Sequence, residues 1–176
     1  MTQLASQIGT QPAIAGRRAP LQIELKFQLD VAPAEAFDLM STRLAEWFAQ
    51  IHDVTWDHAR SNRGASTLGV CSERVCNFGG KSLLEEIVEF EPGRRYAYRI
   101  DMAKSQMKMP IRNHLGTFAI EATSTGTASV VTWHQYFDAK WLVPAAMLRW
   151  QMRDKLMRPA VDEAIRKYGG VWIKNK

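Results

Sequence analysis

His114 and Tyr98 are side chains of this sequence that could carry out acid–base chemistry. An imidazole changes its charge close to neutral pH, so His114 could remove an acidic proton from a ketone-like substrate or donate to its carbonyl. His114 also follows a methionine-containing segment, residues 103–113, which could form the mouth of a cavity. In the alternative interpretation, His114 ends a strand and is hydrogen-bonded to loop backbone.

Two adjacent carboxylates, Glu85 and Glu86, offer a second acid or base. They lie in a predicted strand, residues 82–90, where neighbouring side chains point to opposite faces, so one of the two must point inward. The face that carries Glu86 is the more apolar, which favours Glu86. A carboxylate in an apolar cavity has a raised pKa, as a general acid or base near neutral pH requires. The alternative is a carboxylate at the rim that pairs with Arg94 or Arg95.

Side chains that bind metals or form covalent intermediates are sparse. The two cysteines, Cys71 and Cys76, are a poor disulfide framework and, without clustered histidines, a poor zinc site. No histidine pair has ligand spacing next to a carboxylate, and no Ser-His-Asp or Cys-His pattern is apparent. We therefore predict no metal and no cofactor.

The residues named above fall within a series of predicted strands. Residues 21–31 alternate strictly between apolar and polar side chains, which is typical of a strand with one buried face. A proline and a glutamate favour a short helix over residues 33–40, and a second short helix is predicted over residues 41–50. Six further strands, separated by turn residues, are predicted at residues 52–58, 67–75, 82–90, 94–102, 114–122 and 128–138.

The last part of the chain is predicted to be one long helix. Between Val143 and Tyr168 apolar residues recur with a period near 3.6, and charged residues fill the opposite side. Pro159 is expected to kink this helix near its middle, because proline cannot donate the helical hydrogen bond. Gly169 and Gly170 are a natural stop.

This order of elements predicts an α+β fold, in which a seven-stranded antiparallel sheet wraps around the long C-terminal helix, with two short helices after the first strand. A curved sheet around one helix leaves space between them, so an internal cavity is expected. Residues 21–170 form the predicted domain. Residues 1–20 are expected to be a flexible N-terminal tail, and residues 171–176 a C-terminal tail.

Four segments carry a family resemblance: Val31 to Phe37 (VAPAEAF), Glu85 to Pro92 (EEIVEFEP), Arg94 to Ile100 and Val131 to Trp133. In these segments the chain resembles the START-like (SRPBCC) superfamily, and its polyketide cyclase/dehydrase and lipid-transport group in particular. The resemblance extends over residues 21–168. It implies a helix-grip fold with a hydrophobic ligand cavity, but it does not imply a reaction. The sequence has no Cys-x-His Rieske pair, so an oxygenase subunit is not expected.

Strand alternation indicates which side chains face the expected cavity. In three of the predicted strands, residues 94–102, 114–122 and 128–138, the inward parity is the one that carries the apolar residues. Methionines are flexible and polarizable, so those of the long helix and of the long connection could line an adaptable pocket. The predicted ligand-binding residues are Tyr96, Tyr98, Met102, His114, Phe118, Trp133, Gln135, Met147 and Trp150.

Composition and charge restrict the partners. The 176 residues are 46% hydrophobic and 23% charged, as in an ordinary globular chain. The net charge of +5 is concentrated in residues 149–176, where eight Lys/Arg stand against three Asp/Glu. This pattern favours a solvated helix face over a nucleic-acid-binding surface. No apolar run reaches the roughly 18 residues of a membrane span, and no signal peptide is evident. We expect a cytoplasmic protein with no integral membrane segment, and a homodimer is compatible with the sequence.

Three classes of function follow from these observations. The favoured one is a carrier or sensor that binds a small hydrophobic molecule, such as an aromatic, polyketide-like or lipid molecule, in the cavity. The second is a cofactor-independent polyketide cyclase/dehydratase that uses His114, Tyr98 and an inward glutamate, for which Glu86 is preferred. The third and weakest is a protein-interaction module that uses the basic face of the C-terminal helix.

Overall fold

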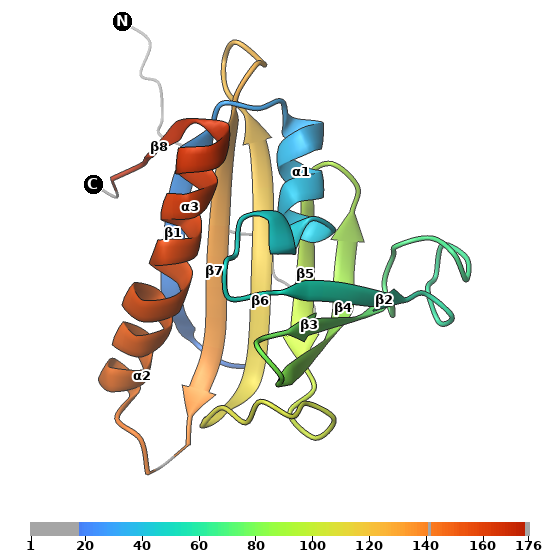
Figure 1. Cartoon of the computed structure of the whole chain (residues 1–176), viewed down its shortest axis with the longest axis vertical. Helices are drawn as coiled ribbons and strands as arrows, with labels where there is room; N and C mark the ends of the chain where they lie inside the picture. Colours follow the sequence, from blue (N-terminus) through green and yellow to red (C-terminus); the bar gives the residue numbers. More distant parts are fainter. Residues whose placement is uncertain (1–17, 141, 175–176) are drawn as a thin grey trace, which may run out of the picture.

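A computed structural model describes residues 18–140 and 142–174 of the chain. Its strands form one antiparallel sheet in the order β2-β3-β4-β5-β6-β7-β1-β8 (Figure 1). The α+β class and the large antiparallel sheet are as predicted, but the sheet has eight strands instead of seven. The strands are β1 (Leu21–Leu29), β2 (Asp53–Asp57), β3 (Glu73–Asn77), β4 (Ser82–Glu91), β5 (Arg95–Ile100), β6 (Ile111–Ala122), β7 (Ser129–Ala139) and β8 (Gly170–Trp172).

The helices pack on one face of the sheet (Figure 1). The first is α1 (Pro33–Ser41), as predicted. The predicted second short helix is only one 3-10 turn, η1 (Leu44–Glu46). The C-terminal helix consists of α2 (Ala145–Met152), a π-helical segment η2 (Arg153–Met157) and α3 (Arg158–Tyr168). In the described residues, no helix has both the length and the apolar character needed to cross a bilayer.

The irregularity of the C-terminal helix lies just before Pro159, where a kink was expected. Proline has no N–H to donate to the carbonyl four residues earlier, and its ring crowds that carbonyl. Residues 153–157 accordingly form a widened π-helical turn, and α3 then begins with Pro159 in its first turn. A proline is well accommodated at that position.

The core fills the space between the sheet and the helices. In β1 the residues of odd number from Ile23 to Leu29 are buried, in agreement with the predicted alternation. They join inward side chains of the other strands, α1, η1 and the C-terminal helix in one large apolar cluster. A curved sheet closed by one long helix is the helix-grip arrangement that the sequence predicts.

Strand β8 corrects the prediction that residues 171–176 form a tail. Residues 170–172 pair with β1, and the Trp172 ring meets Phe27 edge-on at 6.1 Å between centroids. The reversal from α3 into β8 depends on Gly170, which has a φ of 129°. A Cβ atom there would lie 2.0 Å from the Gln28 carbonyl oxygen, so only glycine fits.

The outer face of the sheet carries a second, small apolar cluster. Ala19 is buried there against Ala97, Leu115 and Tyr136. Ala19, which falls within the expected N-terminal tail, therefore contacts the body of the fold. Residues 1–17, most of the expected N-terminal tail, lie outside the described residues.

Candidate functional site

A cavity of about 60 Å³ lies between the inner face of the sheet and the C-terminal helix. Five strands, β3 to β7, contribute to its wall, together with the segment around η1, the helix and the connection between β5 and β6. Its polar lining residues are Arg74, Cys76, Glu85, Tyr98, His114, Trp133 and Gln135. Its apolar lining residues are Leu44, Phe48, Ile51, Phe78, Leu83, Ile100, Met107, Met109, Phe118, Met152, Leu156 and Met157.

The size of the cavity limits what it can hold without rearrangement. A water molecule needs roughly 10–15 Å³ of such volume, so about four to six waters would fill it. A larger guest requires side chains to move. Four of the lining residues are methionines, Met107, Met109, Met152 and Met157, whose unbranched side chains adapt easily to new shapes.

His114 lines the cavity from the inner face of β6, next to a bulge in this strand. Asn113 adopts a positive φ of 53°, and the register with β7 shifts between Arg112 and Leu115. From Leu115 onward the pairing with β7 is regular, so alternation puts His114 on the inner face with Gly116 and Phe118, and the extra residue before it returns Ile111 to that same face. The ring is buried, and both of its nitrogens have partners: the Ile100 N–H donates to Nδ1 at 3.3 Å, and Nε2 lies 2.6 Å from Gln135 Oε1.

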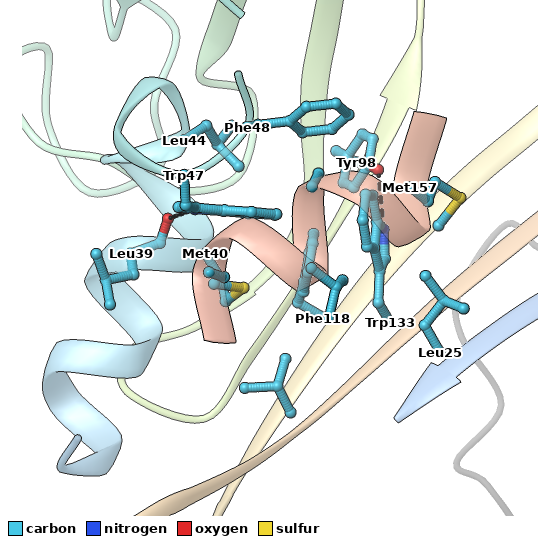
Figure 2. Packing of buried hydrophobic residues seen from close by; sticks show 14 of the residues in the cluster. Leu25, Leu39, Met40, Leu44, Trp47, Phe48, Tyr98, Phe118, Trp133 and Met157 are labelled. Atoms are coloured by element: carbon cyan, nitrogen blue, oxygen red, sulfur yellow. Dashed lines mark hydrogen bonds between the residues drawn. The ribbon is translucent and has the colours of Figure 1, made fainter. Parts of the chain in front are cut away.

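Tyr98 continues this polar chain. Its hydroxyl oxygen accepts hydrogen bonds from Gln135 Nε2 at 2.7 Å and from Trp133 Nε1 at 3.3 Å. Figure 2 shows the Trp133 indole nitrogen facing the Tyr98 hydroxyl. The Tyr98 ring lies directly over Gly116 of β6, where an added Cβ would come within 2.2 Å of the ring. Strands β5, β6 and β7 thus hold four polar side chains in one connected group.

An ion pair between Arg74 and Glu85 forms the second polar group of the cavity. The Arg74 guanidinium donates from Nε to Glu85 Oε2 and lies over the Tyr98 ring, 4.8 Å from its centroid. Both side chains are almost fully buried. Burial is the largest single influence and would lower the pKa of Arg74, but the Glu85 carboxylate, together with Tyr96, Cys76 and Tyr98, holds this pKa well above its ordinary value. The guanidinium therefore stays charged.

The C-terminal end of α1 depends on the same group of side chains. The last carbonyls of a helix have no partner within it and carry partial negative charge. Here the Ser41 carbonyl accepts from Arg74, the Met40 carbonyl from Tyr96, and the Leu39 carbonyl from Trp47. The Trp47 bond is drawn in Figure 2. The arginine of the cavity thus also fixes the position of α1.

Burial determines the protonation states of the other polar residues. It raises the pKa of the Tyr98 hydroxyl well above its ordinary value, so Tyr98 is a neutral phenol. It likewise raises the pKa of the Cys76 thiol, which is therefore no thiolate nucleophile. Burial lowers the pKa of His114 to about 4, and the hydrogen bond to Gln135 opposes this shift only in part. At neutral pH the imidazole is uncharged.

The structure brings together five of the predicted ligand-binding residues at the cavity wall: Tyr98, His114, Phe118, Trp133 and Gln135. Tyr96 is buried in the adjacent core, and Met102 packs against that core without lining the cavity. Met147 and Trp150 were predicted to face inward, but they are 50% and 51% exposed on the outer side of α2. The inward positions of that helix belong to Leu148 and Met152.

The preference for Glu86 as the inward carboxylate is wrong. Glu85 is buried at the cavity wall, whereas Glu86 lies on the opposite face of β4. Neither Arg94 nor Arg95 is the partner of Glu85, because they form ion pairs with Glu89 and Glu91.

Arg74 is the charged residue of the cavity wall that was not among the predicted site residues. The sequence feature that could have indicated Arg74 is the turn after β3. There Asn77 pairs with Ser82, and this register sets Arg74 opposite Glu85. The predicted strand ended at residue 75, two residues short of the turn, so this register and the cross-strand charge pair could not be read from it. In the described residues, no three His, Cys, Asp or Glu side chains are grouped as a metal site would require.

The lowered pKa of His114 predicts a loss of stability in mild acid. The unfolded state takes up a proton near pH 6.5, but the folded state does so only near pH 4, so between these values the unfolded state binds more protons. Lowering the pH from 7 to 5 should therefore reduce the free energy of unfolding by about 2 kcal/mol through this residue. Urea unfolding of the wild type and of His114→Gln at both pH values measures this effect.

The comparison between the two proteins isolates the contribution of His114. The other histidines, His52, His58 and His134, are present in both, so their contributions cancel in the difference. His114→Gln should be less stable than the wild type at pH 7 but should lose less stability on acidification. Equal losses in the two proteins would show that His114 is not the group responsible.

Comparisons with known proteins agree with the fold described above. A family model described as polyketide cyclase / dehydrase and lipid transport matches residues 20–168. No curated protein matches the chain.

Solved structures give the same result for the fold. A solution structure of a protein from Thermobifida fusca is 21% identical, with 84% of this chain and 92% of that chain covered and a TM-score of 0.66. A START superfamily protein from Mycobacterium smegmatis is 10% identical, with 85% and 97% covered and a TM-score of 0.64. The di-domain ARO/CYC protein BexL from the BE-7585A biosynthetic pathway is 14% identical, with 81% and 44% covered and a TM-score of 0.62. At these identities the likeness concerns the fold alone.

Proposed function

Because the chain belongs to the polyketide cyclase / dehydrase and lipid transport family and has its START-like fold, we propose that it binds a small hydrophobic molecule as a carrier or sensor. The ligand occupies the cavity between the sheet and the C-terminal helix. An apolar wall interrupted by a few placed polar groups is the usual composition of a small-molecule site. The flexible methionines of the wall allow it to open around the guest.

One observation favours a carrier over an enzyme: the two groups of the cavity that could accept a proton, His114 and Glu85, are already engaged. His114 Nδ1 accepts the Ile100 N–H, so the lone pair that a general base would use is occupied. Glu85 is held by Arg74 and would have to give up this ion pair to take a proton. Neither group can take up a proton from a bound molecule without giving up its present partner.

The cyclase/dehydratase alternative is supported by the family description and by the same residues. In this version Glu85 replaces Glu86 as the inward carboxylate, and Tyr98 polarises a carbonyl while His114 or Glu85 moves the proton. It requires the ligand to displace the Ile100 N–H or Arg74 from its present partner. It needs no cofactor.

The protein-interaction alternative has less support. Several cations of the C-terminal helix are paired within that helix: Arg153 and Arg158 with Asp154, and Arg166 with Glu163. Pairs of this kind reduce the field that the basic face presents to a partner.

Native mass spectrometry of the purified protein tests the proposal. A carrier should retain a small hydrophobic molecule that is released by denaturation and is recovered unchanged after incubation with fresh protein. His114→Ala should weaken its binding by no more than one hydrogen bond, about 0.5–1.5 kcal/mol, and Trp133→Ala should cost more through lost apolar contact. Conversion of the molecule, slowed about 10²–10⁴-fold by His114→Ala, would instead establish the cyclase.

A further inference from the structure

We infer that the ligand carries a hydrogen-bond acceptor oxygen, such as a ketone carbonyl, and that this oxygen receives the Tyr98 hydroxyl proton. The inference rests on the proposed function and specifies the chemistry of its ligand. The starting point is the backbone N–H of Ile100, which can only donate. From this donor, the hydrogen-bond directions of His114, Gln135 and Tyr98 are fixed one after another as far as the cavity.

The first step fixes the His114 tautomer. A backbone N–H is always a donor, so the His114 Nδ1 that faces the Ile100 N–H at 3.3 Å must accept. The imidazole is buried and neutral, and therefore carries its single proton on Nε2.

The second step fixes the Gln135 amide. His114 Nε2–H lies 2.6 Å from Gln135 Oε1 and donates to it. With the amide reversed, its NH₂ group would face the imidazole N–H, and two donors would meet at this distance. The Gln135 NH₂ group must therefore be the end that faces Tyr98.

The third step fixes the Tyr98 hydroxyl. Its oxygen accepts from Gln135 Nε2 at 2.7 Å and from Trp133 Nε1 at 3.3 Å, which occupies both lone pairs. The hydroxyl proton is left over, and no oxygen or nitrogen of the described residues accepts it. The buried carboxylate of the cavity, Glu85, is bonded to Arg74 and Cys76 and not to Tyr98.

A ligand in the cavity thus meets the Tyr98 hydroxyl, a donor whose proton has no acceptor among the described residues. A carbonyl oxygen placed on Tyr98 gains a hydrogen bond, whereas a hydrocarbon of the same shape leaves this donor unpaired in an apolar cavity. The bound molecule is therefore apolar over most of its surface and oxygenated at the point that meets Tyr98.

Acetophenone and α-methylstyrene test the inference, because they have the same shape and differ only in C=O against C=CH₂. Their affinities are measured by quenching of tryptophan fluorescence in the wild type and in Gln135→Glu. In this variant a carboxylate accepts from both His114 and Tyr98, so the Tyr98 proton turns away from the cavity. The ketone-to-hydrocarbon affinity ratio should be about 3–10-fold lower in the variant than in the wild type. The different partitioning of the two probes from water affects this ratio equally in both proteins, so it cancels in the comparison.

Gln151→Glu is the matched control, since it adds the same charge at an exposed position of α2 and should leave the ratio unchanged. A second measurement needs no variant. The infrared carbonyl stretch of acetophenone, labelled with ¹³C and bound to the wild-type protein, should lie below its frequency in hexane. A stretch equal to that in hexane, or an unchanged ratio in Gln135→Glu, overturns the inference while leaving the hydrophobic ligand site intact. If neither probe binds the wild type, the proposed function falls as well.

Discussion

Arg74→Met is expected to lower the free energy of unfolding by about 3–5 kcal/mol, because it leaves the Glu85 carboxylate buried without its cation. The side chains of Arg74 and Glu85 are only 2% and 7% exposed, so water cannot replace the lost partner. The substitution also removes the hydrogen bond that Arg74 donates to the Ser41 carbonyl at the end of α1. Urea unfolding followed by circular dichroism measures the change.

Two further variants separate the buried charge from other effects. Arg74→Met combined with Glu85→Leu should recover most of the lost stability, since apolar replacement of a whole buried pair is often neutral or stabilising. Arg94→Met removes an arginine that is 76% exposed in its ion pair with Glu91 and should cost at most about 1 kcal/mol. If Arg74→Met proves as mild as Arg94→Met, or if the double variant recovers nothing, the cavity does not depend on this ion pair.

The sequence predicted most of the sheet because alternation is a local signal. Residues 21–31 alternate without a break, and β1 buries the residues of odd number from Ile23 as expected. The same reasoning placed Tyr98, Phe118 and Trp133 on the inner face. Strand β8 could not be found in this way, because it has only three residues and is held by its pairing with β1 and by the contact of Trp172 with Phe27.

Bulges explain why Glu86 was preferred over Glu85. Strand β4 shifts its register between Ile87 and Glu89, so one extra residue stands there. Before the bulge the inner face carries Glu85 and Ile87, and after it the inner face carries Phe90, which packs against Phe37. Simple alternation assigns Phe90 to the face of Glu86 and makes that face look more apolar than it is. Nothing local in the sequence marks the bulge.

The exposed positions of Met147 and Trp150 have a similar cause. Counting back from the inward Met157 in steps of 3.6 residues puts positions 150 and 146 on the buried side. The π-helical segment η2 adds a residue to one turn and rotates α2 by about 100°. Leu148 and Met152 then take the inward positions. Regular periodicity cannot predict this rotation, because it arises from Pro159 and from packing on the sheet.

Gly116→Ala is expected to abolish binding in the cavity. The added methyl group would lie 2.2–2.5 Å from atoms of the Tyr98 ring, so the ring must leave its position over β6. The ring then moves toward the cavity, breaks its bonds with Gln135 and Trp133, and fills part of the small space available to a ligand. Overpacking of this kind should reduce the free energy of unfolding by about 1–3 kcal/mol. Titration with acetophenone, followed by tryptophan fluorescence, and urea unfolding measure the two effects.

Combining Gly116→Ala with Tyr98→Leu is the test that attributes both losses to one contact. Leucine removes the ring that meets the new methyl group, so the double variant should be more stable than the sum of the two single changes predicts. It should also regain binding of α-methylstyrene, which needs only apolar space. It should bind acetophenone no more tightly than α-methylstyrene, because the hydroxyl donor is gone. Binding by Gly116→Ala equal to that of the wild type would contradict the role of Gly116, because it would mean that the Tyr98 ring can yield without entering the cavity.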